Sequence, residues 1–188
     1  MTRPLLALLF SLVIVPQTVF VPPTGPDVIV ESHARERGRL RVTAFEAAER
    51  YGVDPALVFA VIDLDSGWNP RLVHVNEDQS RDYGLGQLND RTWPWLAERV
   101  GIENPDPMDP EQNVAMMAWF LAYLSRKCGP DPHRILTSYN RGEWGMQAWV
   151  ASRGTARSAY STAVLARRKG GRTSDEERRG YGSGGANQ

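Results

Sequence analysis

The sequence predicts a mostly α-helical fold with one small β-hairpin lobe. Three Asp-Pro pairs are typical helix starts, because Asp caps the helix and Pro occupies its first position. These pairs are Asp54-Pro55, Asp109-Pro110 and Asp131-Pro132. Residues 71–90 mix polar, glycine and β-branched types without a helical period, which favours a hairpin or irregular loop. With 188 residues and 41% apolar content, the chain can bury one core, so we expect a single domain with appendages.

Each expected helix has its own start or stop signal. The first begins at Thr43, whose spacing from Glu46 is that of a capping box, and stops at Gly52. The second runs from Pro55 to about Ser66. Later helices are expected at Pro94–Val100, at Pro110–Lys127, from Pro132 through Tyr139, near Glu143–Ser152 and at Ser158–Arg168.

The two ends of the chain differ in composition from the domain between them. In residues 1–21, Arg3 precedes an apolar run of the size of a secretory signal, which predicts a signal peptide or an uncleaved N-terminal membrane anchor. Either one exports the chain to a periplasmic or extracellular location. Residues 22–41, proline-rich and then charged, are predicted to be a linker, and the Gly- and Ser-rich residues 170–188 a disordered tail. The folded domain is predicted to be 42–169.

Charge and cysteine content exclude several classes of partner and cofactor. The 22 basic and 22 acidic residues cancel, so no net field indicates a nucleic-acid partner. Cys128 is the only cysteine and cannot form an internal disulfide. The three histidines are isolated, without metal-ligand spacing, and we expect neither a metal nor another cofactor.

Asp65 has an unusual position for a charged residue on its expected helix. Leu57, Val61 and Asp65 are spaced by four and therefore share one helix face, whereas Asp63 lies on roughly the opposite face. A carboxyl group at the end of an apolar stripe is desolvated, which raises its pKa and keeps it protonated near neutral pH. Such a protonated carboxyl group can act as a general acid.

Three separated motifs carry a family resemblance. They are Asp65-Ser66-Gly67-Trp68-Asn69-Pro70, Asp82-Tyr83-Gly84-Leu85-Gly86-Gln87 and Ser138-Tyr139-Asn140. Together they resemble the lysozyme-like superfamily of muramidases and lytic transglycosylases. Tyr51–Val58 and Leu136–Gly142 are similar to segments of the bacterial lytic transglycosylases in particular. The resemblance spans about Thr43–Arg167 and implies an α+β lysozyme-like fold.

The resemblance assigns roles to individual residues. Asp65 stands where the family has the glutamate that protonates the glycosidic oxygen and then acts as base on the C6 hydroxyl, giving a 1,6-anhydro product from the MurNAc-GlcNAc β-1,4 bond of peptidoglycan. Ser66 would orient this acid, and Gln87, Tyr139 and Asn140 would shape the glycan cleft. The family also implies peptidoglycan strands as substrate and, for its small members, a secretion or conjugation assembly of the cell envelope as partner.

Two departures leave alternatives open. Asp65 replaces Glu, which withdraws the carboxyl group by roughly 1.5 Å, and Gly86 replaces the usual Met. A misplacement of about 1 Å can cost on the order of 10²-fold in rate, so a catalytically weak or inactive peptidoglycan-binding module is one alternative. Asp82 follows Asp65 by 17 residues, the spacing of acid and nucleophile in animal-type lysozymes, so a muramidase that uses both carboxyl groups is another.

The six tryptophans suggest sugar stacking, a common role of exposed aromatic rings. For Trp93, Trp95 and Trp119, however, packing in the core is the better interpretation of the sequence.

Overall fold

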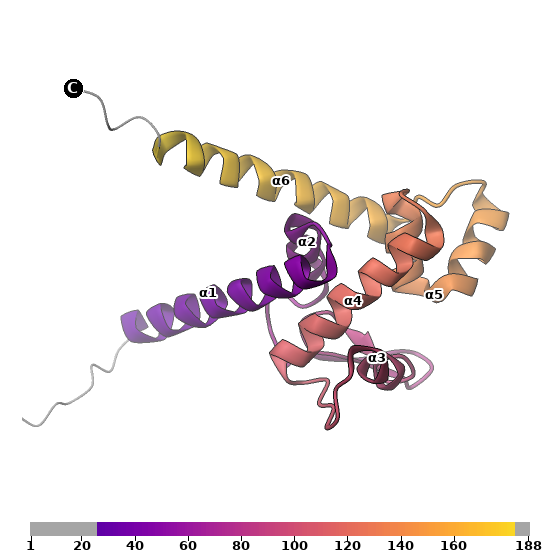
Figure 1. Ribbon diagram of the computed structural model, residues 1–188, viewed down its shortest axis with the longest axis horizontal. Coiled ribbons are helices and arrows are strands. Elements are labelled where there is room, and N and C mark those ends of the chain that lie inside the picture. The colour runs from indigo at the N-terminus through magenta and orange to yellow at the C-terminus, as the bar shows by residue number, and fades with distance from the viewer. Residues whose placement is uncertain (1–25, 183–188) are drawn as a thin grey trace, which may run out of the picture.

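The computed structural model describes residues 26–182, which form six helices and one small sheet (Figure 1). The helices are α1 (Pro26–Tyr51), α2 (Pro55–Asp65), α3 (Trp93–Val100), α4 (Pro110–Cys128), α5 (Pro132–Arg153) and α6 (Ala159–Gly182). The strands are β1 (Val73–Val75), β2 (Arg81–Tyr83) and β3 (Leu88–Asn89), antiparallel in the order β1-β2-β3. The predicted mostly α-helical fold with a small β lobe is confirmed.

The three Asp-Pro pairs named above begin helices as the sequence predicted. The Asp54 side chain accepts a hydrogen bond from the Ala56 amide, and Asp109 accepts one from the Gln112 amide, each at 2.9 Å. Asp131 caps α5 in the same way. These caps satisfy amides that the first helical turn leaves without partners.

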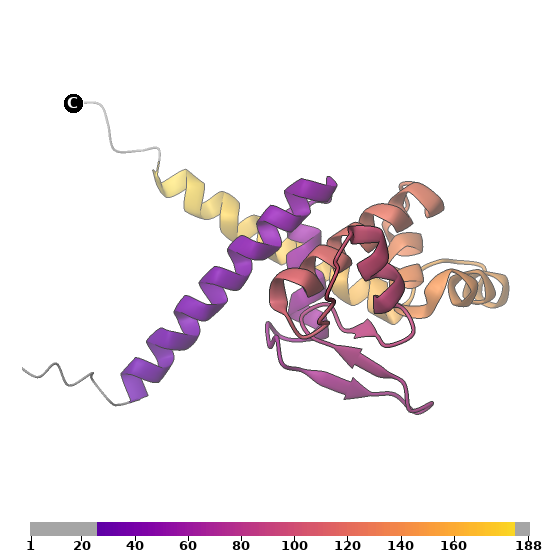
Figure 2. The ribbon, with the colours of Figure 1, turned by 60° about the horizontal axis from the view of Figure 1, so that its bottom comes forward.

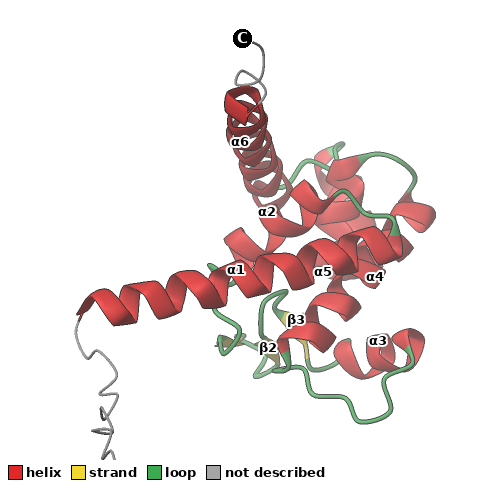
Figure 3. Ribbon diagram, turned by 60° about the vertical axis from the view of Figure 1, so that its left-hand side comes forward, coloured by secondary structure: helices red, strands yellow, loops and turns green. Residues whose placement is uncertain are grey.

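Helix α4 forms the centre of the core. It packs against α1, α3 and α5, while α2 packs between α1 and α6. Its apolar stripe is almost completely buried, as are the central residues of α2. Figure 2 shows the sheet on one side of these helices, and Figure 3 shows the loops that join its strands beside α3.

The predicted linker is partly wrong, because α1 begins at Pro26 rather than at Thr43. Leu40 is only 5% exposed, and the Arg41 guanidinium lies 4.6 Å from the centre of the Phe59 ring. Residues 33–39 are exposed, so their charges form the solvated surface of a projecting helix instead of a tether (Figure 1). The sequence pattern did not predict the first turns of α1, because only the last turns of this helix have an apolar stripe.

The predicted disordered tail is also helical over most of its length, since α6 continues to Gly182. Residues 175–179 are acidic and arginine residues, most of which are good helix formers, and they offset the neighbouring glycines. The predicted signal or anchor segment at 1–21 lies outside the described residues. Between residues 26 and 182, no helix combines the length and apolar character needed to cross a membrane.

Candidate active site

A cleft of about 1460 Å³ lies between the β lobe and helices α5 and α6. Five of the six residues predicted for the site line it: Asp65, Asp82, Gln87, Tyr139 and Asn140. They come from four separate segments of the chain. The sixth, Ser66, does not line this cleft.

Asp65 is the last residue of α2 and is half-buried at the cleft wall. The Tyr160 hydroxyl donates a hydrogen bond to its Oδ2 atom at 3.0 Å. Burial raises the pKa of Asp65 from 3.8 to about 7, against the lowering effect of the Tyr160 hydrogen bond and with a further contribution from the charge of Asp82. The carboxyl group can therefore hold a proton at neutral pH and release it, as an acid-base catalyst must.

Two stacked tyrosines stand beside this carboxyl group. The rings of Tyr139 and Tyr160 are nearly parallel, at 10°, with centroids 6.5 Å apart. Burial, with the charge of Asp65, raises the pKa of both well above 10.0, so they remain neutral phenols. The Tyr139 hydroxyl donates to the Gly86 carbonyl at 2.6 Å rather than to Asp65. Of the two tyrosines, Tyr160 is thus the one that donates a hydrogen bond to Asp65.

Asp82, on β2, is held by two side-chain amides. Asn76 Nδ2 donates to its Oδ2 atom at 3.0 Å, and Asn89 Nδ2 donates to its Oδ1 atom at 2.7 Å. The same two amides contact the Ser80 hydroxyl at 3.2 and 3.1 Å. Hydrogen bonds to both oxygens fix the orientation of this carboxyl group.

A second layer of the hairpin supports this arrangement. The Ser80 hydroxyl donates to Asp78 Oδ1 at 2.6 Å, and Arg91 Nη1 binds Asp78 Oδ2 at 2.6 Å. The hydrogen bonds from Ser80, and then the Arg91 charge, lower the pKa of Asp78. A continuous polar network therefore runs from Arg91 at the surface to Asp82 in the cleft.

Ser66 does not orient the acid through its hydroxyl, contrary to the role that the resemblance implied. Its Oγ atom donates to the Ile62 carbonyl at 3.0 Å, and the residue is buried. It therefore satisfies a carbonyl near the end of α2. The surface position predicted for Asp63 is confirmed, since its carboxylate is exposed and pairs with Arg167 at 3.1 Å.

The family of the chain follows from comparison with known proteins. The family described as "Transglycosylase SLT domain" matches residues 43–161, which include the acid, the β lobe and both cleft tyrosines. The chain belongs to the transglycosylase SLT family. The fold is accordingly the lysozyme-like one that the motifs implied.

Relatives and solved structures agree with this membership. Endo-type membrane-bound lytic murein transglycosylase A of Klebsiella pneumoniae is 30% identical over 138 residues, covering 64% of this chain and 62% of the relative. Protein IpgF of Shigella flexneri is 42% identical over 45 residues, which is 24% of this chain and 30% of IpgF. The chain thus spans less than two thirds of the length of each.

Two solved structures share the fold. The 70 kDa soluble lytic transglycosylase Slt70 of Escherichia coli aligns with a TM-score of 0.54 at 20% identity, over 65% of this chain and 23% of Slt70. An inactive variant of lytic transglycosylase Slt from Pseudomonas aeruginosa aligns with a TM-score of 0.57 at 18% identity, over 68% of this chain and 23% of that protein.

This SLT domain has a steric reason for glycine at position 86. A Cβ atom there would lie 2.8 Å from the sulfur of Met117, a fully buried residue of α4. The Gly86 amide also donates to Asn113 Oδ1 at 2.8 Å. Met117 therefore occupies the space beside the loop, and the loop backbone packs directly on α4.

Gln87 follows in a strained conformation, with φ of 45°. Its side-chain amide donates to the carbonyls of Gly84 at 2.8 Å and Leu72 at 3.2 Å. The SLT domain thus uses the amide nitrogen of Gln87 to tie the loop together. Asn140 is exposed on α5 at the cleft.

Proposed function

We propose that this chain is a peptidoglycan lytic transglycosylase that cleaves the MurNAc-GlcNAc β-1,4 bond with Asp65 as its acid and base. The observation that carries the proposal is the half-buried Asp65 carboxyl group, with a pKa of about 7, in the wall of a large cleft. Membership of the SLT family and similarity to lytic transglycosylases support this substrate and reaction.

The reaction uses the two protonation states of one carboxyl group. Protonated Asp65 gives its proton to the glycosidic oxygen as the bond from that oxygen to C1 breaks. The resulting carboxylate then takes the proton of the C6 hydroxyl while the C6 oxygen bonds to C1. Asp65 ends protonated and no water is consumed, so a pKa near the working pH serves both steps.

Tyr160 positions this acid. Its hydrogen bond occupies Oδ2 of Asp65, which leaves Oδ1 as the oxygen available to carry the transferred proton. Because Tyr160 stays neutral, the same bond favours the carboxylate after proton transfer. Tyr160 thereby limits the rise that burial alone would cause in the pKa of Asp65.

One observation favours a second candidate, a muramidase that uses Asp65 and Asp82. The two amides that hold Asp82 would orient its carboxyl group beside an oxocarbenium-like transition state. In that case water replaces the C6 hydroxyl and the products have reducing ends.

We further propose that the chain acts in the cell envelope after export. The apolar N-terminal residues 1–21 and the resemblance to small transglycosylases of secretion and conjugation systems support this location and such an assembly as partner.

A release assay with purified peptidoglycan tests the function. We expect the full chain to liberate soluble muropeptides and Asp65→Asn to lower this rate at least 10²-fold. Asp63→Asn is the matched control, because it changes the same group on the opposite face of α2 and should retain activity. Retention of the protein on peptidoglycan without any product would instead indicate a glycan-binding module and contradict the proposal.

A further inference from the structure

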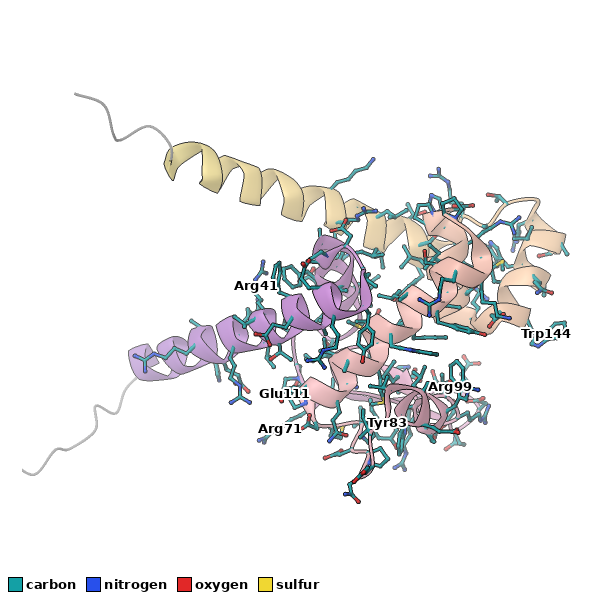
Figure 4. The ribbon with its side chains drawn as sticks, viewed as in Figure 1. Arg41, Arg71, Tyr83, Arg99, Glu111 and Trp144 are labelled. Atoms are coloured by element: carbon teal, nitrogen blue, oxygen red, sulfur yellow. The ribbon has the colours of Figure 1, made fainter. Side chains whose placement is uncertain are left out.

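Trp144 is the most exposed large apolar residue described in the structure, with 84% of its surface accessible (Figure 4). A large aromatic side chain in this position leaves its apolar faces in water. Neither the core nor the catalytic site described above accounts for it.

The segment that presents Trp144 is rigid. At Gly142 the backbone of α5 leaves helical geometry, with φ of 73° and ψ of 165°. Immediately beyond this kink, Glu143 accepts a hydrogen bond from the Tyr123 hydroxyl at 2.9 Å, and Met146 is buried. The exposure of Trp144 is therefore imposed by a packed helix rather than by a loose loop.

The same segment adjoins the cleft. Asn140, Arg141 and Gly142 all line it, and Gly142 precedes Trp144 by two residues. The Cα atoms of Gly142 and Trp144 are consequently no more than about 7.6 Å apart. The Arg141 guanidinium also lies 4.4 Å from the centre of the Trp149 ring, which joins the cleft wall to the helix that carries Trp144.

The surroundings of Trp144 favour a sugar over a protein partner. The other exposed large apolar residues described in the structure lie on α1 and β1, so Trp144 is a single ring and not part of an extended apolar patch. Its exposed neighbours one turn further along the helix are the polar Gln147 and the small Ala148, and Arg141 before the kink is charged. One flat apolar surface among polar groups matches one pyranose ring, which has apolar C–H faces and hydroxyl edges.

We propose that Trp144 is a distal glycan-binding subsite, on which a sugar ring of the strand stacks after leaving the cleft near Gly142. This inference rests on the proposed function, since it takes the polymer in the cleft to be a peptidoglycan strand. The subsite would make the enzyme prefer long strands, because only these reach from Asp65 to Trp144.

The test compares substrates of two lengths. Trp144→Ala should lower kcat/KM on purified long glycan strands about tenfold, which corresponds to about 1.4 kcal/mol, and leave kcat/KM on a tetrasaccharide muropeptide unchanged. Trp144→Phe should restore most of the preference for long strands, since it keeps an aromatic face. Phe45→Ala is the matched control, because it removes an exposed ring from α1 and should affect neither substrate.

Binding measured in an Asp65→Asn background separates this inference from the proposed function. If Asp65→Asn binds long strands more tightly than the double variant with Trp144→Ala, the subsite stands even where wild-type protein releases no product. Equal binding by the two proteins, or an equal loss of kcat/KM on both substrate lengths, overturns it. A change only in self-association, seen by size-exclusion chromatography, also overturns it.

Discussion

Asp65 should lower the stability of the folded protein at neutral pH, and Asp65→Asn should restore that stability. Burial disfavours the charged carboxylate in the folded state, whereas in the unfolded chain it is solvated. Between pH 3.8 and about 7, the folded protein therefore keeps a proton on Asp65 that the unfolded chain has already released. Stability must fall as pH rises through this window, since the folded state binds more protons.

The size of the effect follows from the two pKa values. At about 1.4 kcal/mol for each pKa unit, the change from 3.8 to about 7 corresponds to a cost on the order of 4 kcal/mol at pH 8 and to almost none at pH 4. Asparagine has nearly the same shape and no charge, and its carbonyl oxygen can still accept the hydrogen bond of Tyr160. Asp65→Asn should thus be more stable than wild type, by an amount that grows from pH 4 to pH 8.

Urea unfolding of both proteins at several pH values measures this difference. Asp63→Asn is the control, because its exposed ion pair with Arg167 contributes at most about 1 kcal/mol. We expect the stability gained by Asp65→Asn to grow with pH. An equal gain in the free energy of unfolding at pH 4 and pH 8, or a loss at pH 8, would refute the idea that ionised Asp65 destabilises the fold.

Three further substitutions test the neighbourhood of the acid. Tyr160→Phe removes the hydrogen bond that lowers the pKa of Asp65, so the fall of kcat/KM at high pH should move upward by roughly one pH unit; an unmoved profile would contradict the positioning role. Asp65→Glu should lower the rate of muropeptide release about 10- to 100-fold. The hydrogen bond from Tyr160 to Asp65 is already 3.0 Å long, so the longer side chain would displace the carboxyl group. A faster enzyme would show that the native aspartate is too short. Gly86→Ala should destabilise the fold by about 1–3 kcal/mol in urea unfolding, because its Cβ would collide with Met117; an unchanged midpoint would mean that Met117 moves aside freely.

Local patterns in the sequence predicted where Asp65 lies on its helix. Helix phase placed Asp65 at the end of a buried stripe and Asp63 at the surface, and the structure agrees. Three of the Asp-Pro pairs located helix starts to the residue. Such features depend on neighbours within a few positions, which is why the sequence alone suffices for them.

Contacts between distant segments could not be predicted in this way. Tyr160 reaches Asp65 across 95 positions of the chain, and no local pattern in the sequence connects the two residues. Asn89 holds Asp82 through the pairing of β2 with β3, two very short strands without a propensity signal of their own. The early start of α1 was missed because its exposed turns have no apolar stripe.

The central claim is that Asp65 alone serves as both acid and base. Mass analysis of the products that wild type and Asp82→Asn release from purified peptidoglycan tests it most directly. We expect 1,6-anhydro ends from both proteins at similar rates. Reducing ends from wild type, together with a collapse of activity in Asp82→Asn, would contradict it and establish the two-carboxylate muramidase instead.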